Sequence, residues 1–346
     1  MRGESRATTK TRHGQPSVAT ARHVDPTLSG RHDASLVGEI EDISLAATEA
    51  ADLGNLAESE RLGRHAFDLA GGLDAGPDRD RALARALRPL GTTLRARGRY
   101  AEAERTFDRG LTAAIVGFGS ASLEVAALLN DLGMTFKYAG RFVEAEAAYG
   151  QARAILESAP EVDPQDLAAL FHNLGGLAHA RGDFEAAEPL ARRAIEIRAE
   201  TVDPRDPAML LDRSAHAAIL DALDRSDEAE AVIRDLLPDL EAALGPDHPE
   251  VAVALNNLAA IVQRRGALDE AEAFYRRVIA IKEARLGAES PALATPLNNL
   301  GTVLAAAGRS DEAGALFRAS IRLLEGAVEE DHPALQAARR NLARHA

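Results

Sequence analysis

The feature that most constrains this chain is an internal repeat with a period of 42 residues. One alanine recurs at that spacing six times, at Ala103, Ala145, Ala187, Ala229, Ala271 and Ala313. A similar phrase surrounds each copy, from GRYAEAE at 98–104 to GRSDEAG at 308–314. A fixed period of this length indicates supersecondary units that stack on their neighbours, rather than one closed core.

Composition favours helices and excludes several kinds of chemistry. Alanine, leucine, glutamate and arginine dominate, and only 4% of the residues are aromatic. The chain has no cysteine, which excludes disulfides, thiolate metal sites and cysteine nucleophiles. A net charge of −14 argues against general nucleic-acid binding. No apolar run approaches the roughly 18 residues that span a membrane. We therefore expect a soluble, cytoplasmic protein that binds neither nucleic acid nor membrane.

The first 35 residues differ from the rest of the chain. Residues 1–35 carry six basic and three acidic side chains, and they have few large apolar residues. They also lack the apolar core of a secretory signal. We expect a disordered basic tail. It could serve only as a solubilising leader, or it could fold back onto the acidic body of the chain.

Each repeat is predicted to form two helices joined by a tight turn. In one copy Pro249 begins the first helix, because its missing N–H would be unpaired in a first turn anyway. Asp206 and Ser290 precede the prolines of two other copies and are good N-caps. Gly266 can adopt the left-handed conformation that ends the first helix. A second helix then follows over about 268–285.

The apolar residues of the first helix lie on one face. Leu255, Leu258 and Val262 have the spacing i, i+3, i+7, and the small Ala259 lies beside them. The second helix contributes the recurring alanine and a larger residue four positions further on, such as Tyr275. Two helices of this kind cannot bury enough surface alone, so each pair must stack on the next.

This pattern resembles a known repeat family. The chain is similar to the tetratricopeptide repeat (TPR) in the spacing of Leu132, Gly133, Phe136, Ala145, Tyr149 and Ala152. The 42-residue period and phrases such as YRRVIAIKEARLG resemble the kinesin light chain type of TPR. The resemblance implies an all-α, right-handed solenoid of stacked antiparallel helix pairs. It also implies a concave groove that binds unstructured peptide motifs.

The repeats divide the chain into segments. After the tail at 1–35, we expect residues 36–346 to form the solenoid. Residues 36–72 resemble an eroded first pair, because the phrase GNLAESE lies 44 rather than 42 residues before the next copy. Six 42-residue pairs are expected over 78–332, and a capping helix over 333–346.

In solenoids of this family, the far side of each first helix lines the concave groove. With an advance of 100° per residue, equivalent positions of successive first helices face it together. The expected groove residues are Asn130, Asp131, Met134 and Lys137; His172, Asn173 and His179; Asn256, Asn257 and Gln263; and Asn298, Asn299 and Thr302.

The expected groove is rich in side-chain amides. Each amide can both donate and accept a hydrogen bond, and could therefore pair with a peptide backbone regardless of sequence. One such bond contributes about 0.5–1.5 kcal/mol net, so several must act together. Alternatively, the asparagines pair with the adjacent repeat and fix the curvature of the solenoid. Both interpretations could hold together.

One central copy departs from the pattern, with Arg213 and His216 at positions that are apolar elsewhere. At one groove position we expect His179 to reach Asp221 on the next first helix, with His172 on the same face. A histidine beside a carboxylate is suited to general acid/base catalysis or to a metal site. Alternatively, this copy is a repeat whose sequence has diverged and which tolerates a polar patch without a functional role.

No HExxH, GxSxG or phosphate-loop motif occurs in the sequence. We therefore predict a non-enzymatic adaptor without a cofactor or bound metal, which holds an extended peptide or a partner protein in its groove. The alternative is an enzyme, or a small-molecule or metal-binding protein, that uses the polar patch around His172, His179 and Asp221. Self-assembly into a homo-oligomer through an exposed end of the solenoid is a further possibility.

Overall fold

The computed structural model describes residues 26–325, 330 and 332–345, and the elements within them are all helical. Most of the tail expected at 1–35 lies outside the described residues. Its last part differs from the expectation, because α1 (Pro26–Asp52) begins at Pro26. Proline is favourable in the first turn of a helix. The sequence predicts disorder here because the residues around Pro26 are mostly polar.

The helices form seven consecutive pairs and one closing helix, which confirms the predicted all-α solenoid. The first helices of the pairs are α1, α3 (Pro77–Ala96), α5 (Leu123–Tyr138), α7 (Pro164–Ala180), α9 (Pro207–Ala222), α11 (Pro249–Arg264) and α13 (Ala294–Ala306). The second helices are α2 (Leu56–Gly71), α4 (Tyr100–Phe118), α6 (Phe142–Ser158), α8 (Phe184–Ala199), α10 (Ser226–Leu244), α12 (Leu268–Leu286) and α14 (Ser310–Leu324). A short 3-10 helix, η1 (Pro291–Leu293), leads into α13, and α15 (Pro333–His345) closes the array.

The ends of the helices follow the expected local chemistry. The Asp206 carboxylate accepts a hydrogen bond from the Ala208 N–H at 2.8 Å and so caps α9. The turns inside the pairs contain glycines with positive φ, such as Gly140 at +75° and Gly266 at +83°. The turn between α9 and α10 has Asp224 at this position instead, with φ of +60°. It is a non-glycine residue in a region that favours glycine.

Small and large residues complement each other within a pair. The six recurring alanines are all fully buried. Gly133 on α5 faces the ring of Tyr149 on α6, and a Cβ at Gly133 would lie 2.5 Å from that ring. Gly301 and Phe317 repeat this relationship between α13 and α14. The glycine therefore allows the two helices of a pair to approach closely around an aromatic side chain.

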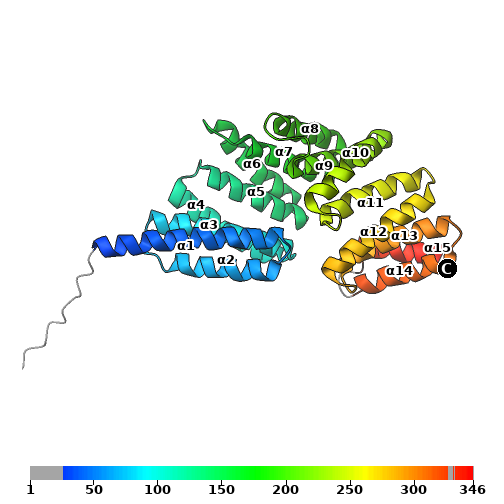
Figure 1. Cartoon of the computed structure of the whole chain (residues 1–346), viewed down its shortest axis with the longest axis horizontal. Helices are drawn as coiled ribbons and strands as arrows, with labels where there is room; N and C mark the ends of the chain where they lie inside the picture. Colours follow the sequence, from blue (N-terminus) through cyan, green and yellow to red (C-terminus); the bar gives the residue numbers. More distant parts are fainter. Residues whose placement is uncertain (1–25, 326–329, 331, 346) are drawn as a thin grey trace, which may run out of the picture.

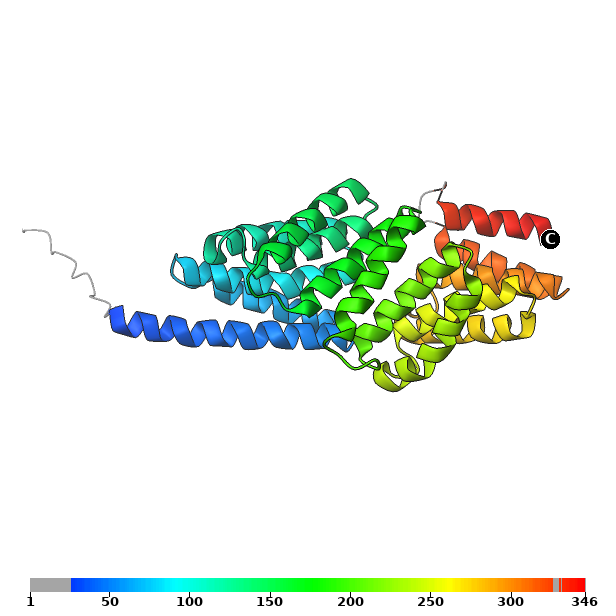
Figure 2. The same ribbon diagram turned by 90° about the horizontal axis from the view of Figure 1, so that it is seen from above.

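The pairs follow one another around an arc (Figure 1). Successive first helices contact each other along this arc, from α1 and α3 to α9 and α11, whereas successive second helices are not in comparable contact. Elements on the inside of a curved stack lie closer together than those outside. The first helices therefore form the inner face of the arc. Figure 2 shows α1 projecting beyond the other helices at the N-terminal end.

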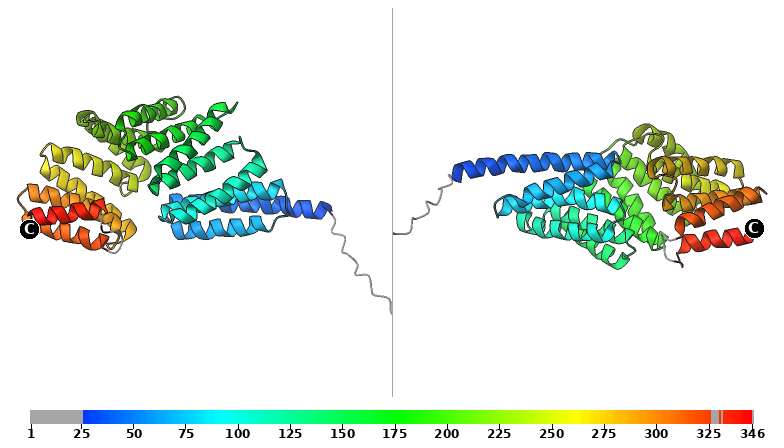
Figure 3. Two further views of the ribbon diagram at one scale, coloured as in Figure 1. Left: turned by 180° about the vertical axis from the view of Figure 1, so that it is seen from behind. Right: turned by 90° about the horizontal axis from the view of Figure 1, so that it is seen from below.

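The first pair and the sixth pair come close together across the arc. The guanidinium of Arg285, near the end of α12, lies against Gly54 in the turn between α1 and α2, in the space that a Cβ there would occupy. Figure 1 and Figure 3 show these segments near one another from opposite sides of the molecule. Gly54 has a φ of +77°, so glycine is favoured there for two reasons.

Charged pairs join consecutive repeats at their turns. The glutamate of each repeated phrase contacts an arginine of the next repeat, for example Glu104 with Arg141 at 2.7 Å and Glu272 with Arg309 at 2.7 Å. The other pairs are Glu60 with Arg99, Glu146 with Arg181, Glu188 with Arg225, and Glu230 with Arg265. Most of these arginines are well exposed, so solvent and salt screen the pairs and each contributes little to stability.

The apolar core follows the arc but is interrupted in its middle. One large cluster of buried residues runs through α3 to α7, and a second runs through α9 to α14. Only small clusters lie between them, one of which consists of Ala187, Ala191 and Ile219. The junction of α7 and α8 with α9 therefore has less apolar packing than the segments that the two large clusters occupy.

Candidate functional site

All of the expected groove residues lie on first helices, namely α5, α7, α11 and α13. Because these helices form the inner face of the arc, the prediction places the candidate site on that face. Most of the side chains are partly exposed, but Asp131 and Asn173 are buried. Met134 packs against the apolar cluster of the N-terminal half, so it contributes to the core.

Polar side chains connect neighbouring first helices at each junction along the inner face. We call this set of contacts the inner ladder. Its pairs are Arg85 with Glu41, Arg88 with Asp131, Asn173 with Asn130, His172 with Asp212, Arg264 with Asp221, Gln263 with Thr302, and Asn341 with Asn298. Much of the predicted amide row is therefore occupied in joining repeats, as the structural interpretation of the asparagines proposed.

Two of these contacts show how the ladder is satisfied. The Asn173 Nδ2 donates to the Asn130 Oδ1 at 3.0 Å. The Asp131 carboxylate accepts a hydrogen bond from the Arg88 Nε at 2.7 Å, and the Arg95 guanidinium donates to both the backbone and the side chain of Asp131. A buried carboxylate with two guanidinium partners is well satisfied. Asp131 is therefore held within the ladder by its own chain.

Three amides of the C-terminal half have no such partner. Within the described part of the chain, the side chains of Asn256 and Asn257 on α11 and Asn299 on α13 make no hydrogen bond, and all three are partly exposed. Their neighbours Gln263 and Thr302 bond to each other at 2.9 Å. The inner face of α11 and α13 thus offers unpaired donors and acceptors beside a satisfied ladder contact.

The expected contact between His179 and Asp221 is not formed, which corrects that part of the sequence prediction. Asp221 accepts a hydrogen bond from the Ser226 Oγ at 2.7 Å and pairs with Arg264 of α11. His179 instead packs at 5.3 Å from the ring of Phe184. Asp221 does not bind His179 because the Ser226 hydroxyl and the Arg264 guanidinium bind the carboxylate more strongly than a neutral imidazole could.

His172 has a carboxylate partner that the sequence analysis missed. Its Nδ1 lies 2.7 Å from the Asp212 Oδ1, and the other oxygen of Asp212 accepts a hydrogen bond from the Arg198 Nε at 2.5 Å. Asp212 is the register equivalent of Leu170 and Ala254, which are core residues. An acidic residue at an otherwise apolar position was the available sign of this network.

Arg213 and His216, the other unusual residues of this repeat, are both paired. The Arg213 guanidinium donates to Asp235 at 2.6 Å, and the His216 ring lies 3.4 Å from Glu188. Neither side chain is in the fully buried core. In the described residues, no three histidine or acidic side chains are grouped as metal ligands would be.

A small cavity of about 110 Å³ lies between α7 and α9. His172, Gly176, His179 and Asp212 line it together with Ala215, Ala218, Ala191 and Ile219. Burial lowers the pKa of His179, and the nearby Lys137 ammonium lowers it further. Both predicted histidines thus face one cavity, with Asp212 in the place expected for Asp221.

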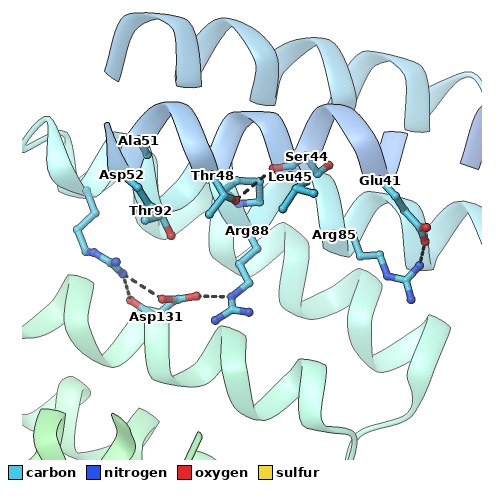
Figure 4. A pocket seen from close by; sticks show the side chains of 12 residues that line it. Glu41, Ser44, Leu45, Thr48, Ala51, Asp52, Arg85, Arg88, Thr92 and Asp131 are labelled. Carbon is cyan, nitrogen blue, oxygen red and sulfur yellow. Dashed lines mark hydrogen bonds and ion pairs between the residues drawn. The ribbon is translucent and has the colours of Figure 1, made fainter. Parts of the chain in front are cut away.

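A larger cavity, about 640 Å³, lies on the inner face between α1, α3 and α5 (Figure 4). Arg85, Arg88 and Arg95 line it, together with the acidic side chains of Glu41 and Asp131. Apart from Asp131, the residues that line it lie on α1 and α3, from which the sequence analysis named no groove residue. Arg88 is, however, 42 residues before Asn130, so the repeat register itself would have identified it.

Among the described residues, none of the helices combines the length and the apolar character needed to span a bilayer. Residues 82–158, 166–241, 213–284 and 293–334 match models of the tetratricopeptide repeat. The chain belongs to the tetratricopeptide repeat family. The family and fold predictions are thereby confirmed. No curated protein matches this TPR chain in sequence.

Several solved structures are similar to the TPR array. BtubC (BKLC) from P. vanneervenii is 22% identical, with a TM-score of 0.53 over 68% of this chain and 92% of that one. A Rap protein complexed with Competence and Sporulation Factor is 15% identical, with a TM-score of 0.64 over 91% of this chain and 85% of that one. The Rap conjugation gene regulator of the plasmid pLS20, in complex with the Phr* peptide, is 16% identical, with a TM-score of 0.54 over 90% and 84%. At these identities the likeness shows the fold.

Proposed function

We propose that this protein is a non-enzymatic scaffold that binds an extended peptide, or an extended segment of a partner protein, along the inner face of its arc. The observation that carries the proposal is the unpaired state of Asn256, Asn257 and Asn299 within the described residues, beside amides that are paired. A role in joining repeats accounts for the paired amides. It does not account for these three.

The chemistry of an amide suits an extended ligand. Each free amide can accept a hydrogen bond from a peptide N–H and donate one to a peptide carbonyl. In an extended chain these groups point to both sides at regular intervals, so a row of amides on α11 and α13 can bind them without regard to side chains. The flanking Ala260 is small and leaves room for ligand side chains.

The similar structures support this reading. The Rap conjugation gene regulator, which shares the fold, is a complex with a peptide. Protein-interaction function is general among TPR proteins, and a curved stack of short helix pairs presents an extended concave surface. The free amides support binding of the ligand backbone along α11 and α13 of that surface.

The proposal is tested with linear peptides selected from a random display library against the full chain. Affinity for the selected peptides is then measured by fluorescence anisotropy for the native protein and for Asn257→Ala combined with Asn299→Ala. At about 0.5–1.5 kcal/mol per hydrogen bond, the double variant should weaken binding between about fivefold and a hundredfold. Its helicity and melting temperature should change little, because among the described residues neither side chain makes a hydrogen bond.

Gln151→Ala is the matched control, since Gln151 is an exposed amide on the second helix α6. It should leave the affinity unchanged. Selection of no peptide at all, or peptides that bind the double variant as tightly as the native protein, would contradict the proposal.

A further inference from the structure

Lys137, in the last turn of α5, is a cation without an anionic partner. No hydrogen bond or ion pair of its ammonium occurs within the part of the chain that the structure describes, and its contact is with the face of the Tyr138 ring at 4.9 Å. Burial lowers the pKa of Lys137, and the neighbouring Arg95 lowers it further. The C-terminal end of a helix favours a cation but supplies no counter-ion.

The ammonium of Lys137 lies against the backbone of the next first helix. Its Nζ is 3.2 Å from the place where a Cβ at Gly176 on α7 would be. Any larger residue there would compete with the ammonium for this space. Because Gly176 has no side chain, the Lys137 ammonium can lie on the inner face between α5 and α7.

Two imidazoles flank this position. His172 and His179 precede and follow Gly176 on α7, and all three line the cavity of about 110 Å³. The Nδ1 of His172 is engaged by Asp212, which leaves its Nε2 without a partner among the described residues. The ring nitrogens of His179 are likewise without a hydrogen bond in the described structure. The three side chains are thus neighbours on the inner face, with Lys137 against Gly176 and one imidazole on each side of that glycine along α7.

The charges nearby do not neutralise this group. Asp131 is held by Arg88 and Arg95, Asp212 by Arg198, and Asp221 by Arg264. Each of these carboxylates is already shared with an arginine. In a chain whose net charge is −14, an unneutralised positive site on the inner face is the opposite of what overall composition would place there.

We propose that Lys137, with His172 and His179 around Gly176, forms a subsite for one oxyanion group of the bound ligand. The group is a carboxylate or a phosphoryl group, since both present oxygens to ammonium and imidazole N–H donors. This inference deepens the proposed function and rests on it only for the identity of the ligand. The subsite itself can be tested without any peptide.

The test is a titration of the full chain with two small probes, sodium phosphate and sodium acetate, at constant ionic strength near neutral pH. The ring signals of ¹³C-labelled histidines are followed by NMR, and the loss of one signal in His179→Gln identifies that of His179. In the native protein at least one probe should move the His179 signal with saturation. Saturation by phosphate identifies a phosphoryl subsite, and saturation by acetate a carboxylate subsite.

Lys137→Met removes the charge while keeping the length of the side chain, and should weaken the probe affinity at least about tenfold. Lys282→Met, on α12 and away from the inner face, is the matched control and should leave it unchanged. If neither probe saturates, or if Lys137→Met binds as the native protein does, the subsite is overturned. That result would leave the peptide-binding test with Asn257 and Asn299 unaffected, so the two proposals fail separately.

Discussion

The imidazole Nδ1 of His172 on α7 lies 2.7 Å from the Asp212 carboxylate on α9. The same carboxylate accepts a hydrogen bond from Arg198 of α8. This network lies between the two large apolar clusters of the array. Hydrogen bonds and charge pairing therefore join α7, α8 and α9 where neither large cluster reaches across the junction.

Replacing Asp212 with alanine should destabilise the protein strongly. The side chain of Asp212 is 2% exposed and that of Arg198 is 9% exposed, so the change would leave a buried guanidinium without its carboxylate and with only the Gln165 amide oxygen as a side-chain partner. Breaking a buried pair in this way costs about 3 kcal/mol. Urea unfolding measures the effect. The comparison is Asp235→Ala, whose carboxylate is 72% exposed and should cost less than about 1 kcal/mol. Equal effects of the two changes would show that the network adds nothing to the junction.

Asp224→Gly should stabilise the protein by about 0.5–1 kcal/mol, because glycine adopts a positive φ without steric cost. The φ of Asp224 is +60°, at the position where most other repeats have glycine. A higher midpoint of urea denaturation is the expected measurement. Gly266→Ala, at an equivalent turn with φ of +83°, should shift that midpoint in the opposite direction. A lower midpoint for Asp224→Gly would mean that the carboxylate has a role which outweighs the strain.

Two glycine-to-alanine changes on neighbouring helices should have opposite signs. Gly133→Ala places a methyl group 2.5 Å from the ring of Tyr149 and should cost about 1–3 kcal/mol. Gly150→Ala on α6 meets nothing within 4 Å and should stabilise by about 0.5–1 kcal/mol through helix propensity. Thermal melting of the two variants checks the prediction. A stabilising Gly133→Ala would show that the close approach of α5 and α6 is not needed.

Stability should fall as the pH drops below about 6.5, and His179 should cause part of that loss. Burial and Lys137 lower the pKa of His179 in the folded protein below its ordinary value of 6.5. The unfolded chain therefore binds this proton more readily, so acidification favours unfolding in the interval between the two values. Urea midpoints at about pH 7 and pH 5 should differ less for His179→Gln than for the native protein. An identical difference would exclude His179 as a contributor.

The sequence predicts the fold well because one period controls several independent features at once. The recurring alanines are all fully buried, Gly140 and Gly266 have the expected positive φ, and Asp206 caps its helix. Each of these properties is local to one pair. A repeat copies the same local requirement many times, so an error in reading one copy is corrected by the others.

The site was harder to predict because its contacts join different repeats. Whether Asn130 bonds to Asn173, or His179 to Asp221, depends on side-chain rotamers and on competing partners such as Arg264. The period places these residues on one face but does not choose between partners on it. Similarly, the arginine of the repeated phrase recurs at Arg99, Arg141, Arg225 and Arg309, yet its pairing with the preceding glutamate requires the stacking geometry.

The separation of Arg285 and Gly54 depends on the curvature of the whole array. A change of a few degrees at each junction of the inner ladder accumulates along the array, so the separation of these two residues amplifies motions too small to detect within any single pair. Within the described structure Arg285 makes no hydrogen bond to the turn at Gly54, so the two segments meet there by packing alone. A ligand that opens or tightens the arc would therefore change the distance between Arg285 and Gly54 more than any distance within a single helix pair.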